Sequence, residues 1–453
     1  MEETTKVQEN KMGVMPENKL LISMAVPMML SMLVQALYNV VDSIFVARIS
    51  EDALTAVSLA FPVQNLMIAV GAGTGVGVNA LLSKSLGEKN QKMANKAAHN
   101  GILLMLFSFI ACALFGLFGS RWFFTTQTED LVLIEYGQQY LSVVMLFSFG
   151  LYGQFITERL LQATGRTLYT MVTQGLGAII NIILDPIMIF GLLGFPALGI
   201  TGAAVATVVG QMIAALLGLW FNVKKNPDIQ LSVKELKLDG GVIRKIYSVG
   251  VPSIIMGSIG SVMTYGMNRI LMGFSSTAAA VFGVYFKLQS FFFMPVFGLN
   301  NGMVPIIAYN YGARKKERIM KTLKLAIMYA VSIMIVGFLV MQIFPAQLFL
   351  LFDASADMLA IGVPALRFIS ISFIFAGYCI IAGSMFQALG HGVLSMVNSL
   401  ARQLFVLLPV AYLLSLTGNL NLIWLSFPIA ELVSLTLSSV FLYRIYQKVI
   451  KPL

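Results

Sequence analysis

The strongest constraint on this chain is an internal repeat, in which prolines and glycines recur at a separation of 225 residues. Pro27 recurs as Pro252, and Gly77 recurs as Gly302. Longer stretches match at the same separation, since GVNALLSKSLG from residue 77 aligns with GMVPIIAYNYG from residue 302. A repeat of this length indicates two copies of one structural unit, each occupying about half of the chain.

Composition places both copies in a membrane. Hydrophobic residues make up 58% of the chain and charged residues 11%, and the mean hydropathy is +0.84. This leaves too little polar surface to cover a soluble globule. Backbone polar groups must pair internally in lipid, so apolar stretches of about 20 residues or more are expected to be helices. Twelve such spans are predicted, at residues 20–47, 53–83, 95–120, 132–163, 168–193, 199–223, 247–273, 278–308, 318–346, 359–389, 393–417 and 420–445.

Twelve spans in two copies predict an all-α polytopic fold with two pseudo-symmetric six-helix lobes. Because six is even, both copies start on the same side of the membrane and are related by an axis along its normal. Duplication of this kind is typical of secondary transporters, whose substrate site tends to lie between the copies. The predicted parts are an N-terminal tail at 1–19, an N-lobe at 20–223, a linker at 224–246, a C-lobe at 247–445 and a C-terminal tail at 446–453.

The orientation follows from the lysine and arginine residues. The tails and the even-numbered loops hold 24 of them, whereas the opposite loops hold only Arg48 and Arg121. Positive charge stays on the inner side, so both termini are predicted to be cytoplasmic in a multi-pass protein of the cell membrane. The net charge of +10 is spread over loops rather than gathered on one folded face, so no nucleic-acid partner is expected.

The first predicted span carries a polar stripe. Gln35, Tyr38, Asn39 and Asp42 are separated by helical spacings, which puts them on one face of an otherwise apolar helix. An acid within the hydrocarbon costs about 3 kcal/mol on insertion scales, so Asp42 is interpreted as functional. This face is expected to border a cavity or another helix.

The fifth span carries a matching stripe of Gln174, Asn181 and Asp185. Pro186 follows the acid and has no amide hydrogen, which frees the carbonyl of Ile182 one turn back. A free carbonyl beside a carboxylate and an amide oxygen makes a plausible site for a proton or a cation. We therefore predict an ion site on this helix.

The sixth span adds Thr207 and Gln211 among small residues that permit close helix approach. Asp42, Asp185 and Thr207 all fall in the predicted outer half of the membrane and are expected to share one pocket. Two nearby acids repel when both are ionised, so the pocket should hold a proton or a cation such as Na⁺. For an isolated Thr or Gln, an ordinary hydrogen bond between helices is the simpler interpretation.

The second copy does not repeat this chemistry. At the 225-residue offset Asp42 falls on Met267, beside Asn268. Lys287 and Glu431 lie within or near the spans of this copy. Two interpretations stay open for Glu431, namely an ion pair with a base such as Lys287 and attraction of a cationic substrate. We expect Asn268, Lys287 and Glu431 to line the substrate cavity together with Gln174 and Gln211.

Several segments, in this order and in these spans, resemble the multidrug and toxic compound extrusion (MATE) family, and the resemblance covers roughly residues 15–447. They are VQALYNVVDSIFVARIS at 34–50, QATGRTLYTMV at 162–172, NIILDPIMIFG at 181–191 and GITGAAVATVVGQ at 199–211. Within the family the chain looks closest to DinF-like and MepA-like prokaryotic members.

The resemblance implies an exporter of organic, often cationic compounds that is driven by inward flow of H⁺ or Na⁺. It implies coupling-ion positions at Asp42, Asn181, Asp185 and Thr207, which would also be the Na⁺ ligands. Gln35, Tyr38 and Asn39 would line the adjoining cavity. The resemblance implies a protein that functions as a monomer without a cofactor. Its partners would be membrane lipid and small organic substrates. The branch of the family with acids in spans 7 and 10 is not matched, because span 7 has Asn268 and span 10 has no acid.

Two alternatives differ in class. A lipid-linked oligosaccharide or lipid flippase of the related superfamily would share the architecture, with a cavity rich in basic side chains such as Arg269, Lys287 and Arg367. A membrane-embedded enzyme is disfavoured, because no acid pair or histidine cluster has catalytic spacing at a membrane surface. His99 and His391 lie in different copies.

Overall fold

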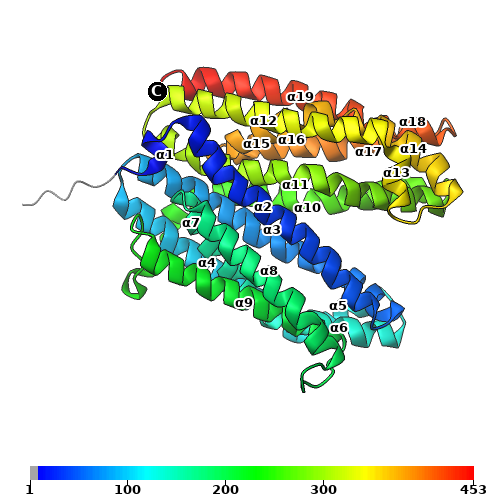
Figure 1. Cartoon of the computed structure of the whole chain (residues 1–453). Coiled ribbons are helices and arrows are strands. Elements are labelled where there is room, and N and C mark those ends of the chain that lie inside the picture. The colour runs from blue at the N-terminus through cyan, green and yellow to red at the C-terminus, as the bar shows by residue number, and fades with distance from the viewer. Residues whose placement is uncertain (1–8) are drawn as a thin grey trace, which may run out of the picture.

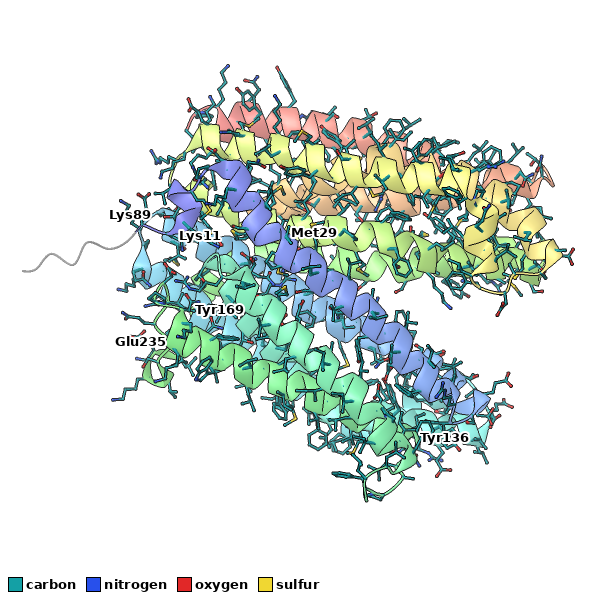
Figure 2. The ribbon with its side chains drawn as sticks, viewed as in Figure 1. Lys11, Met29, Lys89, Tyr136, Tyr169 and Glu235 are labelled. Carbon is teal, nitrogen blue, oxygen red and sulfur yellow. The ribbon has the colours of Figure 1, made fainter. Side chains whose placement is uncertain are left out.

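Helices account for nearly all of the residues from 9 to 453, which are the residues that the structure, a computed structural model, describes. Figure 1 shows two bundles that lie close together at the end holding α1 (Lys11–Val14) and the C-terminus and that diverge toward the opposite end. The first eight residues of the predicted tail at 1–19 lie outside the described part of the chain. We call the end with α1 and the C-terminus the basic end, since Lys11 and Lys89 lie there and Tyr136 lies at the other end (Figure 2).

The N-terminal bundle begins with the long helices α2 and α3, which cross the molecule diagonally in Figure 1. Ser50 starts α3, because its hydroxyl accepts a hydrogen bond from the amide of Ala53 at 3.0 Å. The helices of this bundle are α2 (Glu17–Ala47), α3 (Glu51–Gly87), α4 (Gln91–Phe118), α5 (Ser120–Thr125), α6 (Leu131–Leu146), α7 (Phe149–Ala163), α8 (Thr167–Phe190) and α9 (Ile200–Lys225).

The C-terminal bundle repeats this order after a connector that contains the short helix η1 (Val233–Glu235). Ser275 caps α11 as Ser50 caps α3, with its hydroxyl 3.1 Å from the amide of Ala278. The helices of this bundle are α10 (Gly240–Met272), α11 (Ser276–Gly312), α12 (Lys316–Ile343), α13 (Pro345–Leu350), α14 (Ala356–Ser370), α15 (Phe373–Ala388), α16 (Gly392–Leu400), η2 (Ala401–Leu407), α17 (Leu408–Ser415), α18 (Leu420–Ile423), α19 (Ser426–Ile445) and η3 (Tyr446–Ile450).

The number of membrane spans agrees with the sequence prediction. Ten helices between residues 9 and 453 are long and apolar enough to cross a membrane, and two bent pairs raise the number to twelve if each pair is one span. The bent pairs are α6–α7, with an angle of 44°, and α14–α15, with an angle of 50°. All twelve predicted spans therefore have a counterpart in a fold of two helical bundles.

The two bundles meet through glycines that belong to the repeat. α3 packs against α10, and α2 packs against α11. A Cβ added at Gly77 would lie 2.1 Å from the carbonyl oxygen of Ile246, and one at Gly302 would lie 2.8 Å from the Cα of Ala25. No side chain fits in either place, so the recurring glycines are explained by close backbone approach between the bundles.

At the basic end, α1 contacts both bundles. Asn10 donates from Nδ2 to the carbonyl oxygen of Thr164 at 3.0 Å, and Asn310 donates to the carbonyl oxygen of Met12 at 3.0 Å. Lys315 donates to Glu9 Oε1 at 2.9 Å, and this hydrogen bond holds the pKa of Glu9 below its usual value. The N-terminal segment thus ties the two bundles together where they lie closest.

The connector between the bundles is shorter than the predicted linker at 224–246. α9 continues to Lys225, and α10 begins at Gly240 rather than at residue 247. Asp239 causes the earlier start, because its Oδ1 accepts from the amides of Gly241 at 3.0 Å and Val242 at 3.2 Å. A helix that starts with two glycines needs such a cap, and the hydropathy of residues 240–246 gives no sign of it.

Candidate functional site

Asp42 and Asp185 come together near the diverging end of the N-terminal bundle. Asp42 lies in the last turns of α2, and Asp185 lies in the last turns of α8. Their carboxyl groups are within hydrogen-bonding reach of each other. Asp185 is fully buried and Asp42 is half-buried. Two carboxylates at this separation repel unless they share a proton or a cation, so the pair can bind a positive ion.

Asn181 and Thr207 complete this group. In the orientation that pairs both atoms of its amide, Asn181 donates from Nδ2 to Asp185 Oδ2 at 3.1 Å. Its Oδ1 then accepts from the hydroxyl of Thr207 at 3.2 Å. Asn181 and Thr207 are both buried. The four residues predicted as an ion site therefore form one connected group, which we call the acidic cluster: Asp42, Asn181, Asp185 and Thr207.

Two tyrosines border the acidic cluster. The hydroxyl of Tyr38 lies near Thr207 and Asp42. Tyr140, one turn beyond Tyr136 on α6, faces both carboxyl groups and accepts a hydrogen bond from Gln64 at 3.1 Å. The sequence analysis did not include Gln64 or Tyr140, because an uncharged polar residue within a span is usually an ordinary contact between helices. A search for amide and phenol groups inside spans would have found them.

The acidic cluster keeps oxygen atoms free for an ion. Asp42 Oδ1 and Asp185 Oδ1 are buried, and neither has a hydrogen-bond partner among the residues that the structure describes. Within 9–453, no three His, Cys, Asp or Glu side chains gather as they would around a multivalent metal. Two carboxyl groups with neutral amide and hydroxyl oxygens suit a monovalent cation or a proton better.

A cavity of about 80 Å³ adjoins the acidic cluster. It lies inside the N-terminal bundle, and we call it the N-lobe cavity. Its lining includes six of the residues predicted for the ion site and the substrate cavity, namely Gln35, Tyr38, Gln174, Asn181, Thr207 and Gln211. Gln35 and Tyr38 of α2 and Gln174 and Asn181 of α8 therefore face one cavity.

Glu158 on α7 also lines the N-lobe cavity, and the sequence analysis left it out of the site. It is buried, and it accepts hydrogen bonds from Gln154 at 2.8 Å and from Gln174 at 2.7 Å. Its neighbour Arg159 turns away, donating to Gln162 at 2.9 Å and to Asn301 at 3.2 Å. Glu158 lies near the end of its span, where an acid is unremarkable in sequence alone.

Four other predicted residues lie outside the N-lobe cavity. Asn39 is exposed and Asn268 is half-buried, and neither is among the lining residues of this cavity. Lys287 is exposed, with its ammonium 5.9 Å from the ring centre of Phe352. Glu431 does form an ion pair, but its partner is not Lys287, the base named in the sequence analysis.

The base that pairs with Glu431 is Arg402, whose Nη1 lies 3.1 Å from Glu431 Oε2. Arg402 lies in η2, which packs against α19. The sequence does not reveal this partner, because η2 is a π-helical turn that shifts the helix face away from regular α-helical spacing.

Comparison with known protein families shows the family to which the chain belongs. The MatE family model matches the chain twice, over residues 27–187 and 252–413. The chain belongs to the MatE family. The two matches begin 225 residues apart, so each copy of the sequence repeat is one MatE unit. Members of the MatE family are membrane transporters and not enzymes.

MatE relatives match along nearly the whole chain. A multidrug export protein MepA of Staphylococcus haemolyticus (strain JCSC1435) is 27% identical over 434 residues, covering 94% of this chain and 93% of the relative. A protein of Shewanella oneidensis named FAD transporter is 25% identical over 447 residues, covering 96% of each chain. The relatives thus share this architecture while their names differ in substrate.

Solved MatE structures have the same fold. An outward-facing conformation of a multidrug resistance MATE family transporter of the MOP superfamily superposes with a TM-score of 0.92 at 24% identity, covering 98% of this chain and 99% of that chain. A crystal structure of MATE in complex with MaL6 superposes with a TM-score of 0.91 at 24% identity, covering 98% and 100%. The twelve-span MatE fold is therefore that of a multi-pass membrane protein.

Proposed function

We propose that this chain is a multidrug efflux antiporter that exports organic, often cationic compounds in exchange for H⁺ or Na⁺. The observation that carries the proposal is the contact between the carboxyl groups of Asp42 and Asp185, inside the membrane and beside the N-lobe cavity. Membership of the MatE family supports transport, and the name of the MepA relatives supports multidrug export. A buried pair of acids gives such a transporter a place to bind its coupling ion.

The acidic cluster couples ion binding to the shape of the N-lobe. A bound proton or Na⁺ removes the repulsion between Asp42 and Asp185 and lets α2 and α8 pack closely. Loss of the ion restores the repulsion and favours an arrangement with the two helices further apart. Because Asn181 and Thr207 belong to both the acidic cluster and the lining of the N-lobe cavity, the two arrangements differ in affinity for a compound in the cavity.

The exchange needs ion and substrate to favour different states. Moving a two-state equilibrium from 1:99 to 99:1 takes about 5.5 kcal/mol of differential binding. Repulsion between two charges in a medium of low dielectric is of this order. In this account the lobes at 20–223 and 247–445 move as units about the connector, within a monomer whose basic end faces the cytoplasm. The repeat glycines allow the bundles to separate and close without interlocking side chains.

A flippase would need several basic side chains in its substrate cavity. Arg269, Lys287 and Arg367 all have exposed side chains, and none of them lines the N-lobe cavity. The site therefore favours the antiporter over a flippase for a pyrophosphate-linked lipid.

Export of a cationic dye from proteoliposomes under an imposed proton or sodium gradient tests the proposal. Asp42→Asn keeps the size of the side chain and removes its charge, so we expect ion-driven export to fall at least tenfold. Glu135→Gln is the matched control, because Glu135 is an exposed acid of the same bundle that contacts Gln139. Export by the Asp42→Asn protein at the wild-type rate would contradict the proposal.

A further inference from the structure

The C-terminal bundle holds a cavity at the positions that the repeat makes equivalent to the N-lobe cavity. This C-lobe cavity has a volume of about 360 Å³. Residues of the two linings pair at the 225-residue offset, namely Phe155 with Ile380, Gln174 with Ser399 and Ala178 with Gln403.

A backbone contact beside the cavities is repeated as well. Thr170 donates to the carbonyl oxygen of Glu158 at 3.4 Å, and Ser395 donates to that of Gly383. The two linings therefore share positions related by the repeat, and Ala72, Gly73 and Val76 of α3 border the C-lobe cavity in addition.

The two cavities carry opposite charge. Glu158 is the charged residue in the lining of the N-lobe cavity, and Arg402 is the charged residue in the lining of the C-lobe cavity. At the equivalent positions each partner residue is glycine, because Glu158 corresponds to Gly383 and Arg402 corresponds to Gly177. Each lobe thus places one charge where the other lobe has no side chain.

Arg402 has more hydrogen-bond donors than its ion pair uses. Its guanidinium carries five N–H groups, and the ion pair with Glu431 uses Nη1 at 3.1 Å. Glu431 lines a neighbouring cavity of about 330 Å³, which Arg402 also borders, but it is not part of the C-lobe cavity lining. The ion pair therefore holds the guanidinium in place while other donors are free to face the C-lobe cavity.

Further polar groups surround Arg402. Gln403 donates to the hydroxyl of Ser399 at 3.0 Å. Ser434 is buried in the same lining, and its hydroxyl, which can donate to an anion, has no hydrogen-bond partner among the described residues. Uncommitted polar atoms in a buried wall cost free energy unless a ligand or water pairs with them.

A purely structural ion pair explains less. Buried ion pairs contribute little net stability compared with apolar residues of the same size, so helix packing alone does not call for Arg402 and Glu431. It also does not explain why Arg402 borders a cavity whose lining has no acid.

We propose that the C-lobe cavity binds a carboxylate of the transported substrate through Arg402. The chain then takes zwitterionic compounds in addition to simple cations. This inference rests on the proposed function in taking the bound compound to be a transported one. The binding preference that it predicts is measured without any ion gradient.

The test compares rhodamine B, which has one cation and one carboxylate, with its ethyl ester, which has the same cation and no carboxylate. Binding of each dye to the purified full chain in detergent is followed by fluorescence anisotropy. We expect the wild type to prefer rhodamine B over the ester by about tenfold, the effect of one charge-assisted hydrogen bond. We expect the double variant Arg402→Gln, Glu431→Gln to lose this preference, because it removes the base without leaving Glu431 unpaired.

Three variants sharpen the comparison. Arg402→Lys keeps the charge and should retain part of the preference. Arg367→Gln removes an exposed arginine of the same bundle and should leave the preference unchanged. Glu158→Gln removes an acid from the N-lobe cavity, which shares no lining residue with the C-lobe cavity, and should leave the preference unchanged.

The ratio of the affinities for rhodamine B and its ethyl ester tests the carboxylate site. Equal binding of both dyes by the wild type, absence of binding for both, or a preference that persists in the double variant would overturn the carboxylate site. A preference for rhodamine B that depends on Arg402, in a protein that exports no dye, would support the carboxylate site and contradict the proposed transport function.

Discussion

Among single residues, Asp185 is expected to have the largest effect on how stability depends on pH. It is fully buried beside Asp42, and the residues that pair with it offer an amide rather than a positive charge. An ionised carboxylate in this position is destabilising, because burial and repulsion both oppose its charge. The folded protein should therefore lose stability when the pH rises and both acids ionise.

Asp185→Asn removes that repulsion while keeping the shape of the side chain. We expect the variant to unfold at a higher temperature than the wild type at pH 8, by the equivalent of about 1–3 kcal/mol, and to lose the stabilisation that Na⁺ or low pH gives the wild type. Thermal unfolding of both proteins in detergent, at pH 5 and pH 8 and with and without Na⁺, measures this. A lower unfolding temperature for the variant at pH 8 would show that the carboxylate is favourably solvated.

Helical spacing and the cost of an acid in lipid single out the residues of the acidic cluster in the sequence, and the structure places these residues together. Their role as an ion site stays a prediction. Tyr140 was missed because an uncharged tyrosine in a span has no cost that sets it apart, and its approach to Asp42 and Asp185 depends on tertiary packing. Arg402 was missed as the partner of Glu431, because residues on different helices are matched by tertiary packing that spacing alone does not contain.

Among the elements, the two copies agree closely. α4 begins at Gln91 and α12 at Lys316, and the glycines before α8 and α16 share a φ of 84°. Both bent spans break at places that are equivalent to within one residue, at residues 147–148 and 371–372. The sequence did not predict these breaks, because neither contains proline or glycine. The repeat thus preserves backbone geometry even where local sequence gives no sign of it.

Gly77→Ala tests the role of the repeat glycines. The new methyl group would lie 2.1 Å from the carbonyl oxygen of Ile246, so α3 and α10 must move apart. We expect a loss of about 1–3 kcal/mol in the free energy of unfolding, measured by chemical denaturation in mixed micelles.

Gly260→Ala is the control for that substitution. Gly260 lies in α10 with no atom within 4 Å of the added Cβ, so the change should be neutral or stabilising by up to about 1 kcal/mol. Equal effects of the two substitutions would mean that the glycines serve helix flexibility rather than contact between the bundles.

The whole molecule combines a symmetric scaffold with asymmetric chemistry. The acids of the acidic cluster lie in one lobe, and the cavity of the other lobe that corresponds to the N-lobe cavity carries a base. α1 and its contacts close the basic end, while the bundles diverge at the other end, near which the acidic cluster lies (Figure 1). An ion that enters from the diverging end therefore reaches Asp42 and Asp185 without crossing the contact between the bundles.

The central claim is that the acidic cluster exchanges an ion for a substrate, and dye-driven ion movement tests it most directly. Proteoliposomes are loaded with a cationic dye, and H⁺ or Na⁺ flux is recorded with no ion gradient imposed. We predict that wild-type protein and Glu135→Gln move one of these ions against the direction of the dye, and that Asp42→Asn moves neither. Dye movement by the wild type without ion counterflow, or undiminished counterflow in Asp42→Asn, would contradict the account.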